Sequence, residues 1–127
     1  MADVAALIVD DSSVMRKIVE RALRQSGLSL APVFEAATGA DGLDVLRRER
    51  VDLILTDINM PVMDGLEFLR QLRQQELAPE TPVVMITTEG SEEHVRQALL
   101  AGAQGYIRKP FTAEQVRDRV LPLLDPA

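Results

Sequence analysis

The stretch VAALIVDDSS, residues Val4–Ser13, joins an unbroken apolar run to two acidic and two hydroxyl side chains. A short apolar run rich in β-branched residues predicts a strand over Ala5–Val9 that is buried on both faces. Because Asp and Ser are preferred at helix starts, we expect a helix directly after this strand. The expected helix carries one apolar stripe and ends at a glycine: Val14, Met15, Ile18, Val19, Ala22, Leu23 and Gly27.

The same strand-then-helix unit recurs four more times and accounts for the rest of the chain. We expect these strands at Val33–Ala36, Leu53–Thr56, Val83–Ile86 and Tyr106–Ile107. The helices after them are expected to begin at four capping positions: Thr38, Asp64, Ser91 and Thr112. Short links between strands and helices predict an α/β fold, with parallel strands, right-handed crossovers and helices on both faces. We expect a single domain over residues 1–127, with no output domain.

Two local expectations concern the last two helices. In the fourth helix, Val95, Ala98 and Leu99 have the spacing of inward-facing residues, and Gly102 is expected to end that helix. Pro122 is expected to kink or end the fifth helix, because proline lacks the backbone donor.

The composition narrows the class of protein. The chain has 127 residues, a formal net charge of −6, 46% hydrophobic residues and no cysteine. These values are typical of one globular domain and exclude disulfides and thiolate metal sites. The longest apolar run, Val4–Val9, is far too short to span a membrane, so we expect a cytoplasmic protein with no membrane partner. The net negative charge and the small number of aromatic residues argue against nucleic-acid binding.

Polar side chains follow the predicted strands at their carboxyl ends, where open α/β sheets form their ligand crevice. These residues, in chain order, are Asp10, Asp11, Asp57, Thr87, Thr88 and Lys109. Carboxylates held close together disfavour each other's ionisation unless a cation neutralises them. Mg²⁺ prefers a few carboxylates together with waters and phosphate oxygens. The sequence therefore predicts a magnesium and phosphate site at this edge of the sheet.

Asp57 is the best-placed nucleophile in this site, because it follows the central strand and aspartyl phosphate formation is a known covalent route. Thr87 can donate a hydrogen bond and Lys109 supplies a positive charge, which suits the oxygens of a transferring phosphoryl group. Each residue also has a plainer interpretation. Asp10 and Asp11 are good helix caps, Thr87 is a good strand former, and a lysine is normally a solvated surface amine.

Each of four predicted strands is followed by its own polar motif: Asp10-Asp11, Asp57, Thr87 and Lys109-Pro110. This arrangement resembles the receiver domains of two-component response regulators over essentially the whole chain. The resemblance implies a doubly wound, flavodoxin-like (CheY-like) parallel sheet of strand order 2-1-3-4-5. It also implies that Asp57 accepts a phosphoryl group from the phosphohistidine of a histidine kinase or phosphotransfer protein.

The resemblance implies a metal site and a phosphoryl site built from the same residues. Mg²⁺, with Mn²⁺ as a substitute, would be held by four residues: Asp10, Asp11, Asp57 and, through its backbone carbonyl, Asn59. Lys109 and Thr87 would bind phosphoryl oxygens, with a cis peptide bond at Lys109-Pro110 aiming the lysine inward. Such a protein catalyses its own phosphoryl transfer and hydrolysis without being an enzyme in the turnover sense.

The resemblance also implies a switch that another protein reads. On phosphorylation the Thr87 hydroxyl would move toward the phosphate and Tyr106 would turn into the space released. The changed surface would be that of the fourth helix, the fifth strand and the fifth helix, where Arg108 adds charge. The sequence leaves open the output partner, the kinase, and whether the protein is a monomer or a phosphorylation-dependent dimer.

Among receivers, the chain is most similar to the stand-alone CheY-like type, through Asn59, Glu89 and Tyr106. It departs at Thr88, where a smaller residue is usual, so Asn59, Thr88 and Glu89 are expected to set the lifetime of the phosphate. Chemotaxis-type signalling, a phosphorelay shuttle and a cell-cycle adaptor are all open. Two alternatives have other functions: a haloacid dehalogenase-type phosphatase, which would need an acid where Asn59 stands, and a docking module that signals without phosphate.

Overall fold

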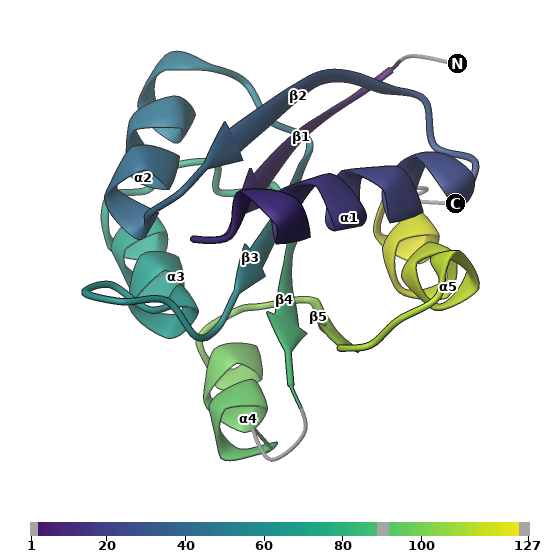
Figure 1. Ribbon diagram of the computed structural model, residues 1–127. Coiled ribbons are helices and arrows are strands. Elements are labelled where there is room, and N and C mark those ends of the chain that lie inside the picture. The colour runs from purple at the N-terminus through teal and green to yellow at the C-terminus, as the bar shows by residue number, and fades with distance from the viewer. Residues whose placement is uncertain (1–2, 89–91, 125–127) are drawn as a thin grey trace.

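The computed structural model describes residues 3–88 and 92–124, which alternate strictly between strands and helices (Figure 1). The strands are β1 Val4–Val9, β2 Leu30–Ala36, β3 Leu53–Asp57, β4 Val83–Thr87 and β5 Gly105–Arg108. The helices are α1 Ser13–Gln25, α2 Gly39–Arg48, α3 Gly65–Gln74, α4 Glu92–Leu100 and α5 Ala113–Leu124. The predicted strands are thus all present. β2 is three residues longer than the sequence indicates, and the others are longer by one or two residues.

The strands form one parallel sheet in the order β2-β1-β3-β4-β5. The chain starts at β1, moves to the edge strand β2, and then returns past β1 to build β3, β4 and β5 in turn (Figure 1). This confirms the predicted α/β fold and strand order. The direction of winding reverses between β1 and β3, which is where open α/β sheets bind their ligands, beyond the carboxyl ends of the strands.

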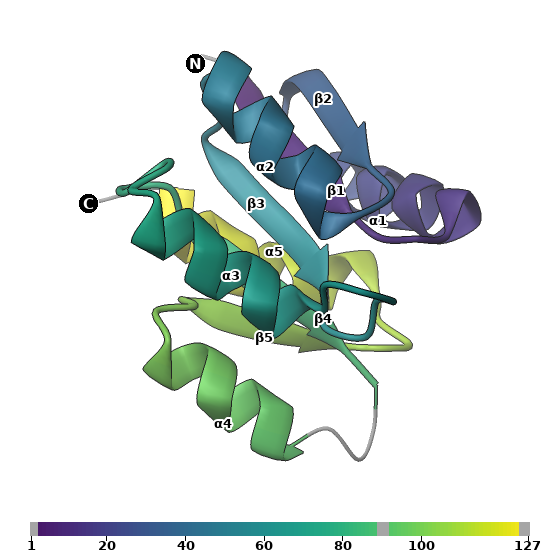
Figure 2. The same cartoon turned by 90° about the vertical axis from the view of Figure 1, so that its left-hand side faces the viewer.

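Two helical layers cover the sheet, with α2, α3 and α4 on one face and α1 and α5 on the other (Figure 2). Alternate residues of β1 enter opposite cores: Leu7 and Val9 pack with the first group of helices, and Ala6 and Ile8 with the second. Because side chains along a strand point alternately to the two faces, a strand covered on both sides must be apolar throughout. This explains the unbroken apolar run Val4–Val9.

Side-chain caps begin the helices close to where the sequence predicts. Ser12 accepts a hydrogen bond from the amide of Met15, Thr38 from that of Asp41, and Asp64 from that of Glu67. At α5, Thr112 and Gln115 exchange side-chain and backbone hydrogen bonds in a reciprocal capping box: Thr112 Oγ1 accepts at 3.1 Å and Gln115 Oε1 at 2.9 Å. The predicted start at Ser91 lies outside the described residues.

Two expectations about the helices were wrong, and a third was wrong in part. Val14 is 68% exposed and Ile18 is 46% exposed, and Leu99 of α4 is also exposed. At 3.6 residues per turn the predicted stripe of α1 covers about half of the helix circumference, and the sheet contacts only the side of Val19, Ala22 and Leu23. α5 does not end at Pro122 but continues to Leu124, so a kink at Pro122, the other expected outcome, stays a prediction. Pro122 lies in the last turn, so few backbone hydrogen bonds follow it.

Among the residues that the structure describes, no helix has the length and apolar character required to cross a membrane.

Candidate functional site

The carboxyl ends of the parallel strands place the predicted site residues at one edge of the sheet. Asp10 follows β1, Asp57 ends β3 and Thr87 ends β4, while Lys109 follows β5. Asp10 is 2% exposed and Asp57 is 5% exposed, which is unusual for aspartates. Asp11, in contrast, is exposed at the rim. The site therefore has a buried floor and an open mouth.

Three carboxylates meet in this site. Asp10, Asp11 and Asp57 each offer a carboxylate oxygen, and these oxygens all lie within 4.8 Å of one another. Asp10 Oδ2 is buried and has no hydrogen-bond partner among the described residues. A buried carboxylate oxygen without a partner is costly unless a cation faces it. This donor set of carboxylate oxygens fits a hard divalent cation such as Mg²⁺.

Lys109 supplies a positive charge inside the cluster. Its Nζ lies 3.5 Å from Asp57 Oδ2 and 3.8 Å from Asp10 Oδ2. Its backbone amide donates to the Thr87 carbonyl at 2.7 Å, which continues the pairing of β4 and β5. The Lys109-Pro110 peptide bond is cis. One ammonium group against three carboxylates leaves an excess of negative charge, which a divalent cation would balance.

Burial dominates the electrostatics of the two inner aspartates. Desolvation raises the pKa of both Asp10 and Asp57 above the usual range of a carboxyl group. The charge of Lys109 and the hydrogen bonds from backbone amides oppose this rise in pKa without cancelling it. Without a cation, burial therefore makes the charged form of both carboxylates less favourable than it is in water.

The loop after β3 determines where Asp57 lies. The Asn59 amide donates to Asp57 Oδ1 at 3.2 Å, and the Gly65 amide donates to the Ile58 carbonyl at 2.8 Å. A Cβ atom on Gly65 would lie 2.3 Å from the carbonyl oxygen of Asp57. The loop can close against Asp57 only because residue 65 has no side chain. Sequence analysis missed Gly65, although a glycine directly after the cap Asp64 was a visible signal.

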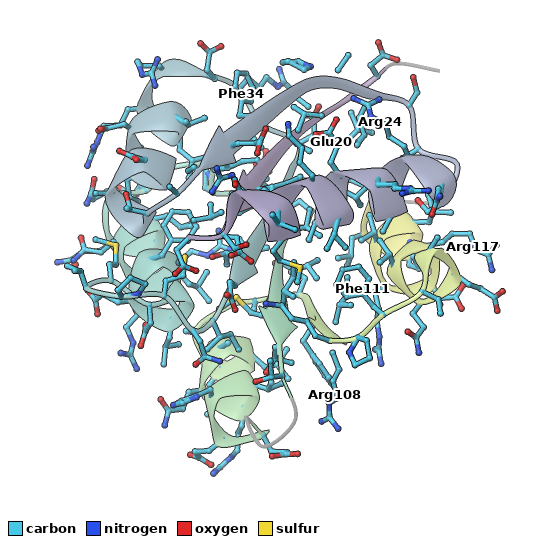
Figure 3. All side chains as sticks on the ribbon, in the orientation of Figure 1. Glu20, Arg24, Phe34, Arg108, Phe111 and Arg117 are labelled. Atoms are coloured by element: carbon cyan, nitrogen blue, oxygen red, sulfur yellow. The ribbon has the colours of Figure 1, made fainter. Side chains whose placement is uncertain are left out.

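The two residues predicted to form the switch lie on neighbouring strands, Thr87 at the end of β4 and Tyr106 in β5. Thr87 is buried, and its hydroxyl donates to the Thr88 carbonyl at 3.1 Å, while Thr88 itself is exposed. Tyr106 is half-buried in β5, with the guanidinium of Arg119 5.2 Å from the centre of its ring. Arg108 projects outward from β5 (Figure 3). Asn59 is exposed, and Glu89 lies outside the described residues.

Comparison with known proteins agrees with this architecture. The sequence model of the response regulator receiver domain family matches residues 6–121. The Chemotaxis protein CheY homolog of Campylobacter jejuni is 40% identical over 119 residues, covering 93% of this chain and 90% of the relative. Chemotaxis protein CheY-3 of Vibrio cholerae is 41% identical over 114 residues, covering 90% and 86%.

Solved structures give the same result. The chemotaxis protein CheY4 of Vibrio cholerae, crystallised at low pH, superposes with a TM-score of 0.84 at 36% identity, covering 97% of this chain and all of that one. A CheY-like response regulator receiver domain protein from Methanospirillum hungatei superposes with a TM-score of 0.84 at 30% identity, covering 98% and 96%.

Proposed function

Because the chain belongs to the response regulator receiver domain family, we propose that Asp57 accepts a phosphoryl group from a histidine kinase or phosphotransfer protein. The chain is a CheY-like receiver domain, a class of signalling protein used in two-component systems. One observation carries the proposal: a buried carboxylate on the central strand β3 lies beside two more carboxylates and one lysine. This arrangement suits a phosphoryl group that arrives with a divalent cation.

The residues of the site fit Mg²⁺, with Mn²⁺ as a substitute. Asp10, Asp11 and Asp57 would hold the cation, and the backbone carbonyl of Asn59 is the proposed fourth protein ligand. The unpartnered Asp10 Oδ2 supports this assignment. When bound, the cation neutralises the crowded carboxylates and the oxygens of the incoming phosphate.

This chain contributes three side chains to the chemical step: Asp57, Lys109 and Thr87. A carboxylate oxygen of Asp57 attacks the phosphorus atom and forms a P–O bond. The P–N bond to the donor's imidazole breaks, and its electron pair stays on the ring nitrogen. Lys109 Nζ, 3.5 Å from Asp57, is placed to bind a phosphoryl oxygen, and the Thr87 hydroxyl would turn from the Thr88 carbonyl toward another. Attack by water on phosphorus later restores the carboxylate.

Intact-protein mass spectrometry tests the proposed chemistry. We expect a mass gain of one phosphoryl group after incubation with acetyl phosphate and Mg²⁺, and no gain when a chelator removes the cation. Acetyl phosphate replaces the unknown kinase as donor. A gain that persists in the chelated sample would contradict the role of the cation, and label on a residue other than Asp57 would contradict the acceptor.

The proposed output face consists of α4, β5 and α5. A groove of about 390 Å³ between α4 and β5 is lined mainly by Val95, Leu99, Leu100 and Tyr106. Leu99 and Leu100 are exposed, so this groove presents apolar surface to solvent. Because the Tyr106 ring lines this groove, an inward turn of the ring would change the shape of the groove. We therefore propose that phosphorylation is read here by a partner protein.

Tyrosine fluorescence reports on this switch, because the chain has one Tyr and no Trp. We expect phosphorylation to change the emission of Tyr106 in the wild type. Lys109→Met should be phosphorylated without a change in Tyr106 emission. The variant lacks the ammonium group that would connect the phosphoryl group on Asp57 to strands β4 and β5. Arg48→Met, at an exposed position on α2, is the control and should keep the wild-type response. A full emission change in phosphorylated Lys109→Met would refute the coupling role of Lys109.

Thr88 is expected to set the lifetime of the phosphate. If its bulk shields Asp57 from water, Thr88→Ala should shorten the half-life about threefold, a change of about 0.7 kcal/mol in the barrier. Thr88→Val keeps the bulk without the hydroxyl and should match the wild type. The half-life is measured from the loss of phosphoryl mass after acetyl phosphate is removed. A short half-life in Thr88→Val would assign the effect to the hydroxyl instead.

A further inference from the structure

Arg16 connects three segments that meet behind the acidic cluster. It belongs to α1, where its Nε donates to Glu35 Oε1 of β2 at 2.8 Å. Its Nη1 donates to the backbone carbonyl of Asp10 at 2.6 Å. The Arg16 side chain is only 14% exposed, so it is held in place along most of its length. A single side chain therefore ties α1, β2 and the turn after β1 together.

The contacts of Asp10 leave one of its polar atoms free. Its amide donates to the Ala36 carbonyl at 3.0 Å, and its carbonyl accepts from Arg16. Its Oδ1 accepts from the Ser12 amide at 2.9 Å. Only Oδ2, which faces Lys109, has no hydrogen bond within the described part of the chain. The backbone and one carboxylate oxygen are thus fixed, and the remaining oxygen is presented to the cluster.

Glu35 is the anchor of this arrangement. It accepts hydrogen bonds from Arg16 and, at 2.7 Å, from Lys17 Nζ. These hydrogen bonds lower the pKa of Glu35, so it stays ionised at neutral pH. It lies opposite Ile8 in the β1–β2 register, next to the pair formed by Val9 and Ala36. Glu35 of β2 therefore fixes the Arg16 side chain near the end of β1, next to Asp10.

We infer that Arg16 is a positioning residue for the cation site, acting through the backbone of Asp10. The inference rests on the proposed function, since it concerns the cation that Asp10 would bind. Arginine suits the role because its planar guanidinium can donate in two directions at once, to Glu35 and to the Asp10 carbonyl. A lysine would have to reach both partners from a single nitrogen, whereas arginine uses Nε for one and Nη1 for the other. Residues behind a metal ligand commonly orient that ligand in this way.

The sign of the effect separates positioning from simple electrostatics. Arg16 carries a positive charge near a cation site, so its charge alone weakens cation binding. Removal of that charge in Arg16→Met would therefore tighten binding if only electrostatics mattered. A positioning role predicts the opposite: a loss of about tenfold in affinity, the low end for changes behind a metal ligand.

The test is a Mn²⁺ titration of the full chain followed by electron paramagnetic resonance, which measures the Kd without any phosphoryl donor. We expect Arg16→Met to bind Mn²⁺ about tenfold more weakly than the wild type, and Arg16→Lys to bind it more weakly as well. Lys17→Met is the matched control, because Lys17 shares Glu35 but does not contact Asp10 in the structure. It should bind Mn²⁺ as the wild type does.

Thermal unfolding in chelator shows whether each variant is folded. Arg16→Lys keeps the charge and gives the answer if Arg16→Met does not fold. A wild-type Kd in folded Arg16→Lys, or tighter binding in Arg16→Met, would overturn the inference while leaving the proposed function intact. A wild-type protein that binds no Mn²⁺ would overturn both the cation site and the inference.

Discussion

Asp57→Asn is expected to abolish phosphorylation completely, because the amide lacks the anionic oxygen that must attack phosphorus. The measurement is the intact mass after incubation with acetyl phosphate and Mg²⁺. Asp118→Asn is the matched control, because Asp118 lies on the surface of α5. Within the described residues, its one ion pair is with Arg117. It should gain one phosphoryl group like the wild type. Stoichiometric labelling of Asp57→Asn would show that the acceptor is another residue.

The same substitution should stabilise the protein when no cation is bound. Burial raises the pKa of Asp57 in the folded state above that of the unfolded chain, so the folded state binds more protons between the two pKa values. Stability therefore falls as pH rises above the ordinary aspartate pKa of about 3.9. Asp57→Asn removes this contribution. We expect its unfolding midpoint in chelator at pH 7 to rise by roughly 3 °C, the shift for about 1 kcal/mol.

Thermal unfolding of both proteins across the acidic pH range tests the sign of this effect. The two midpoints should converge at low pH, where Asp57 is protonated in both the folded and the unfolded state. Asp10, whose pKa is also raised by burial, should leave some pH dependence in the variant. A variant that melts below the wild type at neutral pH in chelator would mean that Lys109 already compensates the buried charge.

Gly65→Ala is expected to damage both the fold and the site. The new Cβ would lie 2.3 Å from the Asp57 carbonyl oxygen and 2.8 Å from Ile58 Cα. Both are backbone atoms at the end of β3, so no flexible side chain can move aside to relieve the contact. We expect a loss of about 2–3 kcal/mol in the free energy of unfolding, in the upper range for overpacking. The displaced Asp57 should also be phosphorylated more slowly, by up to about a hundredfold.

Gly105→Ala is the control, because a Cβ at Gly105 would meet no atom within 4 Å. It should be neutral or slightly stabilising. Denaturant unfolding and the rate of acetyl phosphate labelling measure the two effects separately. Equal stability and equal labelling rates for Gly65→Ala and Gly105→Ala would show that the loop after β3 adapts without moving Asp57.

The alternation of strands and helices could be predicted because its signals are local. The apolar run at Val4–Val9 and the caps Ser12, Thr38 and Asp64 act within a few residues of themselves. Such signals do not depend on what packs against them. The parallel sheet then follows from short crossovers, and the sheet brings residues at its carboxyl edge together. For this reason the sequence alone predicts that Asp10, Asp57 and Lys109 are neighbours.

The class of fold, the order of its elements and the chemical character of one edge of the sheet therefore follow from local residue patterns. Tertiary packing, in contrast, determines which side of the α1 stripe is buried, and it leaves Val14 and Ile18 exposed. It also determines that Gly65 closes against Asp57 and that Arg16 reaches both Glu35 and the Asp10 carbonyl. These contacts join segments that are distant in the chain or whose approach depends on packing, and no local pattern of residues encodes them.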